Sequence, residues 1–254
     1  VHVASLDGGL KMGTTARGEI IRYDNFTFDA EFNPQRIQGR LGTGFKGDGY
    51  VDATFNTGWD DFAPLKGDLY FHNSRLFWLG LFSPDLVRPR GQLAGHIGLA
   101  GTRGRPLLSG EATLTEFTGE LPSLGISLAE GSADLVALSD GSARIDGSMK
   151  TVSSTGGTRT GGGVDVPGTL GWNNDTTPLR FQVRGDNVLV ADTTDLRAVA
   201  SPDIQVGFAD NTIQVRGDVG IPSATIDVEK LDDGVSASED VVVLDPADPE
   251  RAPS

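Results

Sequence analysis

The stretch Ile213-Gln214-Val215-Arg216-Gly217-Asp218-Val219-Gly220-Ile221 places an apolar residue at every second position, with Gly217 inside the apolar row. Alternation with a period of two is typical of a strand that has one dry face and one wet face. The pattern apolar-x-Gly-x-apolar recurs at residues 16–20, 37–41, 65–69, 93–97, 108–112, 145–149 and 166–170. This recurrence predicts a chain built from many similar strands.

The strands are predicted every ten to fifteen residues or so, and Gly, Pro, Asn and Asp turns join them. This spacing favours an antiparallel meander, and roughly 12–16 strands fit the chain length. One break is expected at residues 76–89, where Ser83-Pro84-Asp85 is typical of a helix start and Pro89 of a helix stop. We therefore predict one short helix there, of one or two turns at most.

The composition limits the possible partners. The formal net charge is −14 at pH 7, which argues against nucleic acid and against docking on an anionic membrane surface. Cysteine is absent, so neither disulfides nor thiolate metal sites are expected. No run of about 18 apolar residues is present, and we expect a soluble piece of a larger protein.

The dry faces need a cover, because almost every predicted strand has one. No long amphipathic helix is visible, so the sheet is expected to fold over itself as a sandwich, a barrel or a bent trough. Glycine inside the apolar rows favours strong curvature, since a sandwich core would place bulky side chains there. The residues therefore predict an all-β fold: a strongly curved, mostly antiparallel sheet with at most one or two short helices. A bent trough and a closed barrel both fit this prediction, because barrel corners use glycine in the same way.

The apolar rows supply the candidate functional residues. Each methylene kept from water is worth about 0.8 kcal/mol, so a trough lined by these rows could hold lipid acyl chains. The predicted lining residues are Leu93, Ile97, Leu99, Leu108, Leu114, Leu124, Ile126, Leu128, Leu135, Ile145, Val164, Val166, Leu170, Trp172, Leu179, Phe181, Val183, Ile204, Val206, Phe208, Ile213, Val215, Val219, Ile221, Ile226 and Val228.

Other motifs have simpler interpretations. The Arg-Gly-Asp sequence of cell-adhesion ligands occurs at residues 184–186 and 216–218. We expect both triplets within strands and not on exposed loops, so an adhesion role is not expected. Residues 42–47 have the spacing of a dinucleotide fingerprint, yet a strand rather than a helix is predicted to follow. No zinc-type histidine spacing or nucleophile elbow occurs, so we expect neither an enzyme nor a cofactor or metal site.

Several stretches resemble the C-terminal part of the TamB family, in the AsmA-like group of Gram-negative cell-envelope proteins. They include Val87–Gly95, Pro106–Gly110, Leu121–Ile126, Gly168–Trp172 and Val219–Ala224, within a continuous resemblance from about residue 76 to 244. The resemblance implies an elongated, strongly curved sheet (a β-taco or β-groove) with a hydrophobic concave interior. It implies a periplasmic location as well, with anchoring in the inner membrane by segments that this chain lacks. It also implies an outer-membrane barrel partner of the Omp85 type that is similar to TamA.

The resemblance and the residues together leave three functions open. The first is a groove for phospholipid transport between the inner and outer membranes. The second is a scaffold for assembly of outer-membrane proteins or autotransporters through an exposed strand edge. The third is a repetitive adhesin or solenoid with a filled core.

The expected domain organisation has three parts. Residues 1–90 form N-terminal β-groove repeats that end in the short helical break. Residues 91–231 form the TamB-like C-terminal β-groove, and residues 232–254 form an acidic tail with a possible last strand, partly disordered.

Overall fold

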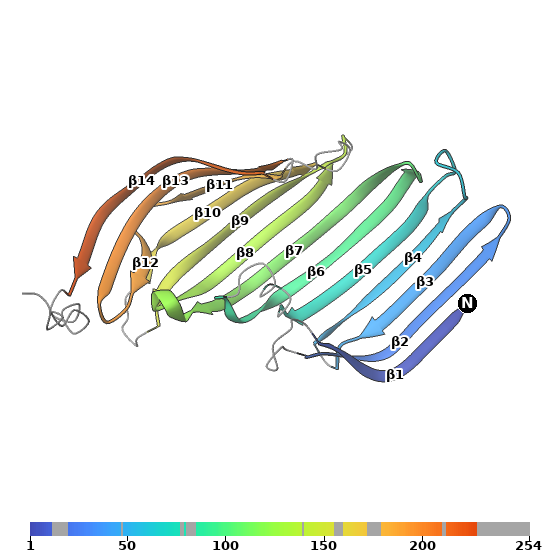
Figure 1. The fold of residues 1–254 in the computed structure, drawn as a ribbon, viewed down its shortest axis with the longest axis horizontal. Coiled ribbons are helices and arrows are strands. Elements are labelled where there is room, and N and C mark those ends of the chain that lie inside the picture. The colour runs from blue at the N-terminus through green and yellow to red at the C-terminus, as the bar shows by residue number, and fades with distance from the viewer. Residues whose placement is uncertain are drawn as a thin grey trace, which may run out of the picture.

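The computed structural model describes residues 1–11, 20–46, 48–76, 79, 85–138, 140–154, 160–171, 179–209 and 212–227. These residues form one long antiparallel sheet (Figure 1). Its strands are β1 (His2–Lys11), β2 (Ile20–Asn33), β3 (Arg36–Gly44), β4 (Gly49–Thr57), β5 (Lys66–Arg75), β6 (Val87–Thr102), β7 (Arg105–Leu121), β8 (Ile126–Leu138), β9 (Ser142–Ser153), β10 (Thr160–Gly171), β11 (Leu179–Gly185), β12 (Val188–Asp192), β13 (Leu196–Ala209) and β14 (Thr212–Ile226).

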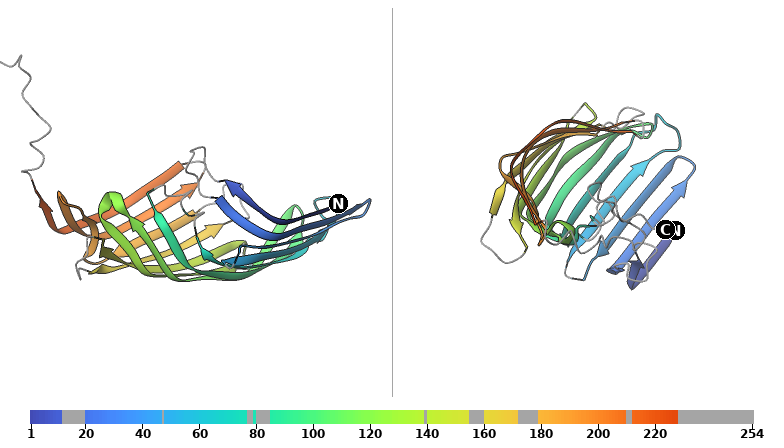
Figure 2. Two further views of the ribbon diagram at one scale, coloured as in Figure 1. Left: turned by 90° about the horizontal axis from the view of Figure 1, so that it is seen from below. Right: turned by 60° about the vertical axis from the view of Figure 1, so that its left-hand side comes forward.

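The strand order confirms the predicted meander. Strands β1 to β11 follow one another in the sheet, and each pairs with the next in antiparallel register. Strand β13 then pairs with β11, β12 and β14. The sheet stays open, because β1 and β14 form its two ends and do not pair with each other. Figure 2 shows the sheet curved into a trough, which is the predicted β-taco.

The register places the apolar rows of successive strands on one face, because residues directly opposite each other in paired strands point to the same side. One unbroken ladder crosses eleven strands, at about 4.8 Å per strand step, and so extends roughly 48 Å. Its members are Thr43, Val51, Phe71, Gly95, Ala112, Leu135, Ile145, Gly168, Phe181, Val206 and Val215.

A row of β-bulges bends the sheet near the end of the strands where β7 meets β8. Arg88, Glu116 and Glu130 have φ of 50°, 53° and 51°, and each lies where its strand carries one extra residue relative to its neighbour. Bulges increase the local twist and bend the strand that carries them. Three bulges on the neighbouring strands β6, β7 and β8 therefore curve the sheet at one rim.

The small core lies at this same rim. The larger buried apolar side chains of the described residues are Leu76, Phe117, Ile126, Val164, Val188 and Leu189. Strand β12 leaves the plane of the sheet there and packs on the apolar face, where the Asn187 oxygen accepts a hydrogen bond of 2.8 Å from the Gly162 nitrogen. A Cβ at Gly161 would lie 2.7 Å from the Leu189 Cβ. We call this apolar face the inner face; among the described residues, β12 covers it at this rim.

Two local predictions are wrong. The helix expected to end at Pro89 does not extend that far, because β6 already begins at Val87; Ser83 and Pro84 lie outside the described residues. Leu124 was expected in a strand row, but it belongs to the short 3-10 helix η2 (Pro122–Leu124). Gly125 follows with φ of 66° and its nitrogen donates to the Pro122 oxygen, a turn that ends β7 before the row can continue.

The sheet runs without interruption across the expected boundary at residue 90. Leu69 of β5 pairs with Ile97 of β6, and residue 90 itself lies inside β6. The expected acidic tail, residues 232–254, lies outside the described residues. The division into three parts remains a prediction.

Candidate apolar groove

The predicted lining residues gather on the inner face. Direct cross-strand pairs join Leu93 to Leu114, Leu99 to Leu108, Leu135 to Ile145, Leu170 to Leu179, Val183 to Ile204 and Phe208 to Ile213. Ile97, Val164, Val166, Phe181, Val206, Val215 and Val219 alternate in phase with these residues along the same strands. Ile126 and Leu128 join the same face through their pairing with Ser153 and Thr151.

The inner face also extends further than the candidate list. Phe28, Leu41, Val51, Leu69 and Phe71, on β2 to β5, pair in register with the same rows. Their alternation is visible in the sequence, although the list of candidates began only at Leu93. The apolar strip therefore continues through the N-terminal strands.

Side chains on the inner face are half-buried in the middle of the sheet and exposed at its end. Leu69, Ile97 and Ile145 are half-buried because neighbouring strands flank them on both sides. On β14, which has a partner on one side only, Ile213 is 67% and Val215 61% exposed. An extended apolar surface that the described elements leave largely open is unusual for a soluble domain and marks an interaction site.

Glycines in the apolar rows make room for phenylalanine rings. Gly39 pairs with Phe55, Gly95 with Phe71 and Gly168 with Phe181. A Cβ at Gly95 would lie 2.6 Å from Cζ of Phe71, and one at Gly168 would lie 2.9 Å from Cβ of Phe181. At Gly39 and Gly95 the phenylalanine ring covers the glycine backbone, a pairing known to support strands that contain glycine. At Gly168 the nearest side-chain atom is Cβ of Phe181.

Gly217 has a different role. Its φ is 140°, and a Cβ there would lie 2.0 Å from the Asp203 oxygen. Only glycine tolerates this conformation and this close approach of two backbones. The glycine rows thus combine bends with aromatic packing.

Several predicted lining residues are placed apart from the open strip. Leu124 lies in η2 and is 41% exposed. Ile126 is only 3% exposed within the small core. Ile221 lies at the register shift of β14, and Ile226 pairs with Leu196 beyond it. Trp172 and Val228 lie outside the described residues.

Polar side chains line the opposite face and pair across it. Lys150 forms an ion pair with Glu130, and the Arg184 Nε lies 3.5 Å from Asp203 Oδ1. His96 lies on this face, with Nε2 3.0 Å from Asp68 Oδ1. Its ring stacks on Tyr70 with a centroid distance of 4.1 Å.

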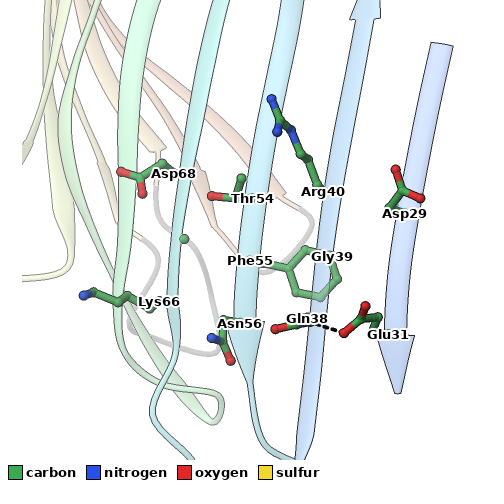
Figure 3. Close-up of a pocket in the computed structure, with 11 residues that line it drawn as sticks. Asp29, Glu31, Gln38, Gly39, Arg40, Thr54, Phe55, Asn56, Lys66 and Asp68 are labelled. Atoms are coloured by element: carbon green, nitrogen blue, oxygen red, sulfur yellow. Dashed lines mark hydrogen bonds between the residues drawn. The ribbon is translucent and has the colours of Figure 1, made fainter. Parts of the chain in front are cut away.

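Hollows in this polar face provide a second kind of surface. One hollow of about 400 Å³ lies on β2 to β5, and its charged lining residues are Arg40, Lys66, Asp29, Glu31 and Asp68 (Figure 3). Acidic side chains outnumber basic ones here. Another hollow, of about 600 Å³, lies on β9 to β14.

Within the described ranges, no helix is long and apolar enough to span a bilayer. The same ranges hold no group of three or more His, Asp or Glu side chains that could bind a metal ion. The structure thus presents one extended apolar strip and a charged reverse face.

The architecture defines a class: an open, curved β-groove with one apolar inner face. Residues 153–254 match the family model of the TamB C-terminal domain, and this part of the chain is a TamB-like region. The match points to involvement in lipid or protein assembly of the cell envelope. Neither the search of curated proteins nor that of solved structures returned a match.

Proposed function

We propose that this chain is a periplasmic segment of a TamB-like protein whose inner face carries phospholipid acyl chains between the inner and outer membranes. The observation that carries the proposal is the single apolar face, which continues in register from β3 to β14. The proposal includes membrane anchoring by segments outside this chain and an outer-membrane barrel partner similar to TamA. It assigns the chain a role in transport and not in catalysis.

The dimensions support acyl chains as the cargo. The eleven-strand ladder extends roughly 48 Å at about 4.8 Å per strand, whereas one acyl chain reaches about 15 Å, half of a ~30 Å hydrocarbon core. Each methylene that leaves water for this face gains up to about 0.8 kcal/mol. Because the gain is the same at every step along an unbroken strip, a lipid can shift along it without passing a polar barrier.

Photocrosslinking at adjacent residues tests this proposal. Ile145 lies on the inner face and Arg144 on the polar face of the same strand. A photoreactive amino acid at position 145 is expected to form adducts with phospholipid in cells, and the same group at position 144 is expected to form few. Equal lipid labelling at the two positions would contradict the proposal.

A second function, a scaffold for assembly of outer-membrane proteins, has its own supporting observation. All fifteen residues of β14 are exposed, and in the described part of the chain this strand pairs with β13 alone. A strand with an unpaired edge can template another strand by backbone hydrogen bonds. The lining side chains matter little for that activity.

Crosslinking from the strand edge separates the two functions. A photoreactive group at Gln214 on β14 should capture strands of an outer-membrane barrel if the scaffold operates, whereas the same group at Gln182 on the interior strand β11 should not. The scaffold would be contradicted if the group at Gln214 captures no barrel strand and if charged substitutions on the inner face alone abolish assembly of outer-membrane proteins.

A further inference from the structure

The hollow of about 600 Å³ on the polar face of β9 to β14 has a regular construction. Cross-strand pairing places its side chains in two neighbouring rows. One row consists of Asp146, Pro167, Gln182, Gln205 and Arg216, and the other of Arg144, Thr169, Arg180, Gly207 and Gln214.

Gly207 forms the open floor of the hollow. A Cβ built on this residue would meet no atom within 4 Å, unlike the glycines of the inner face that lie under phenylalanine rings. Longer side chains surround it: Arg180 is directly opposite on β11 and Gln214 directly opposite on β14. The hollow is therefore deepest where the sheet carries no side chain.

The side chains of the hollow carry a net positive charge, whereas the whole chain is negatively charged. Three arginines and one aspartate line it, giving a net charge of +2 in a chain of net charge −14. Arg144 donates from Nε to Asp146 Oδ2 at 2.9 Å. Arg180 and Arg216 form no ion pair or hydrogen bond with any side chain in the described ranges. Two guanidinium groups thus face the hollow with no carboxylate partner among the residues that the structure describes.

We propose that this hollow binds a phosphate group. Guanidinium groups donate paired N–H bonds that match the geometry of phosphate oxygens, and the hydroxyl of Thr169 and the amides of Gln205 and Gln214 supply further polar atoms. The paired N–H groups of one guanidinium satisfy the two oxygens of a carboxylate. Inorganic phosphate has four oxygens, and a lipid phosphodiester has two terminal and two ester oxygens, so either phosphate can accept from both arginines. The phosphate belongs either to a free anion or to a lipid headgroup.

This inference is independent of the proposed lipid groove, because the hollow and the apolar strip lie on opposite faces of the same strands. A headgroup could reach the hollow at its β14 side, where Arg216 and Gln214 lie on the end strand of the sheet. Phosphate binding can therefore fail while acyl chains still bind, and the reverse also holds.

Two measurements on the whole chain test the site, both in buffer without phosphate. Calorimetric titration with inorganic phosphate detects a free anion. Flotation with phosphatidylglycerol vesicles detects a headgroup when it is compared with flotation with vesicles of a bilayer-forming neutral glycolipid, which carries no phosphate. Acyl-chain contact with the inner face would act on both kinds of vesicle, and the net charge of −14 opposes general attraction to an anionic surface. Flotation specific to phosphatidylglycerol therefore reports the headgroup.

Three variants identify the residues. The double variant Arg180→Gln/Arg216→Gln removes both free guanidinium groups, and Gly207→Leu fills the floor without changing the charge. The matched control is Arg40→Gln, which removes an arginine from the acidic hollow of Figure 3. Thermal midpoints of all variants report whether each one folds.

We expect the wild-type chain to bind phosphate in at least one of the two assays, and the double variant and Gly207→Leu to weaken that binding at least tenfold. Arg40→Gln should change it less than twofold. Binding in the titration alone assigns a free anion, and flotation that added phosphate abolishes assigns a headgroup. Absence of binding in both assays, or equal weakening by Arg40→Gln, would overturn the proposal.

Discussion

The packing of glycine against phenylalanine predicts that two glycines of the same apolar rows respond oppositely to substitution by alanine. At Gly95 an added Cβ would lie 2.6 Å from Phe71 Cζ and 2.9 Å from both Ala112 Cβ and the Glu111 oxygen. The ring can rotate, but the backbone oxygen cannot move far. Overpacking of this kind costs typically 1–3 kcal/mol.

The matched control is Gly147, which lies on the inner face of β9 opposite Ala133 of β8. Its added Cβ would approach no atom closer than 3.5 Å, which is ordinary contact. Alanine there keeps the strand conformation and reduces the backbone entropy lost on folding, so Gly147→Ala is expected to stabilise the chain by about 0.5–1 kcal/mol.

The assay is thermal unfolding followed by circular dichroism. For a chain of this size, 1 kcal/mol corresponds to roughly 2–4 °C in the midpoint. Gly95→Ala should therefore lower the midpoint by about 2–12 °C, and Gly147→Ala should raise it by about 1–4 °C. A Gly95→Ala variant as stable as Gly147→Ala would refute the proposed packing of Phe71 on Gly95.

Two other predictions concern the core and the bulges. Leu189→Ala should lower the free energy of unfolding by about 2–5 kcal/mol, because this side chain of β12 is 2% exposed in the core. Ile213→Ala, at a side chain that is 67% exposed, should lower it by less than about 1 kcal/mol. Equal losses in urea unfolding would be inconsistent with a core confined to the rim. At Glu116, where φ is 53°, Glu116→Gly should raise the free energy of unfolding by about 1 kcal/mol and Glu116→Val should lower it. The reverse order of stability in urea unfolding would exclude the bulge.

Alternation along single strands was enough to predict the antiparallel meander and the apolar face. The pattern around Val215 is local, and a period of two assigns each residue to a face without knowledge of its neighbours. Because most turns are short, each strand pairs with the next, so the rows fall into register. The apolar strip could therefore be predicted residue by residue.

Features that depend on pairing between distant residues could not be predicted in this way. The meeting of Gly95 with Phe71 depends on the exact register of β5 and β6, and the hollow at Gly207 on the register of three strands. Arg88 and Glu116 carry no sequence signal for a positive φ, because bulges there are usually marked by glycine. The break between β11 and β12, which brings Leu189 onto the inner face, is likewise a tertiary effect.

The central claim is that the inner face holds lipid, and native mass spectrometry of the chain purified without detergent tests it most directly. We predict phospholipid adducts on the wild-type chain that disappear in Leu114→Glu, where a carboxylate interrupts the apolar strip, and persist in Thr113→Glu, where the same charge lies on the polar face of the same strand. Both residues are half-buried, so the comparison isolates the face. A wild-type chain that retains no phospholipid, or adducts lost equally in the two variants, would contradict the account.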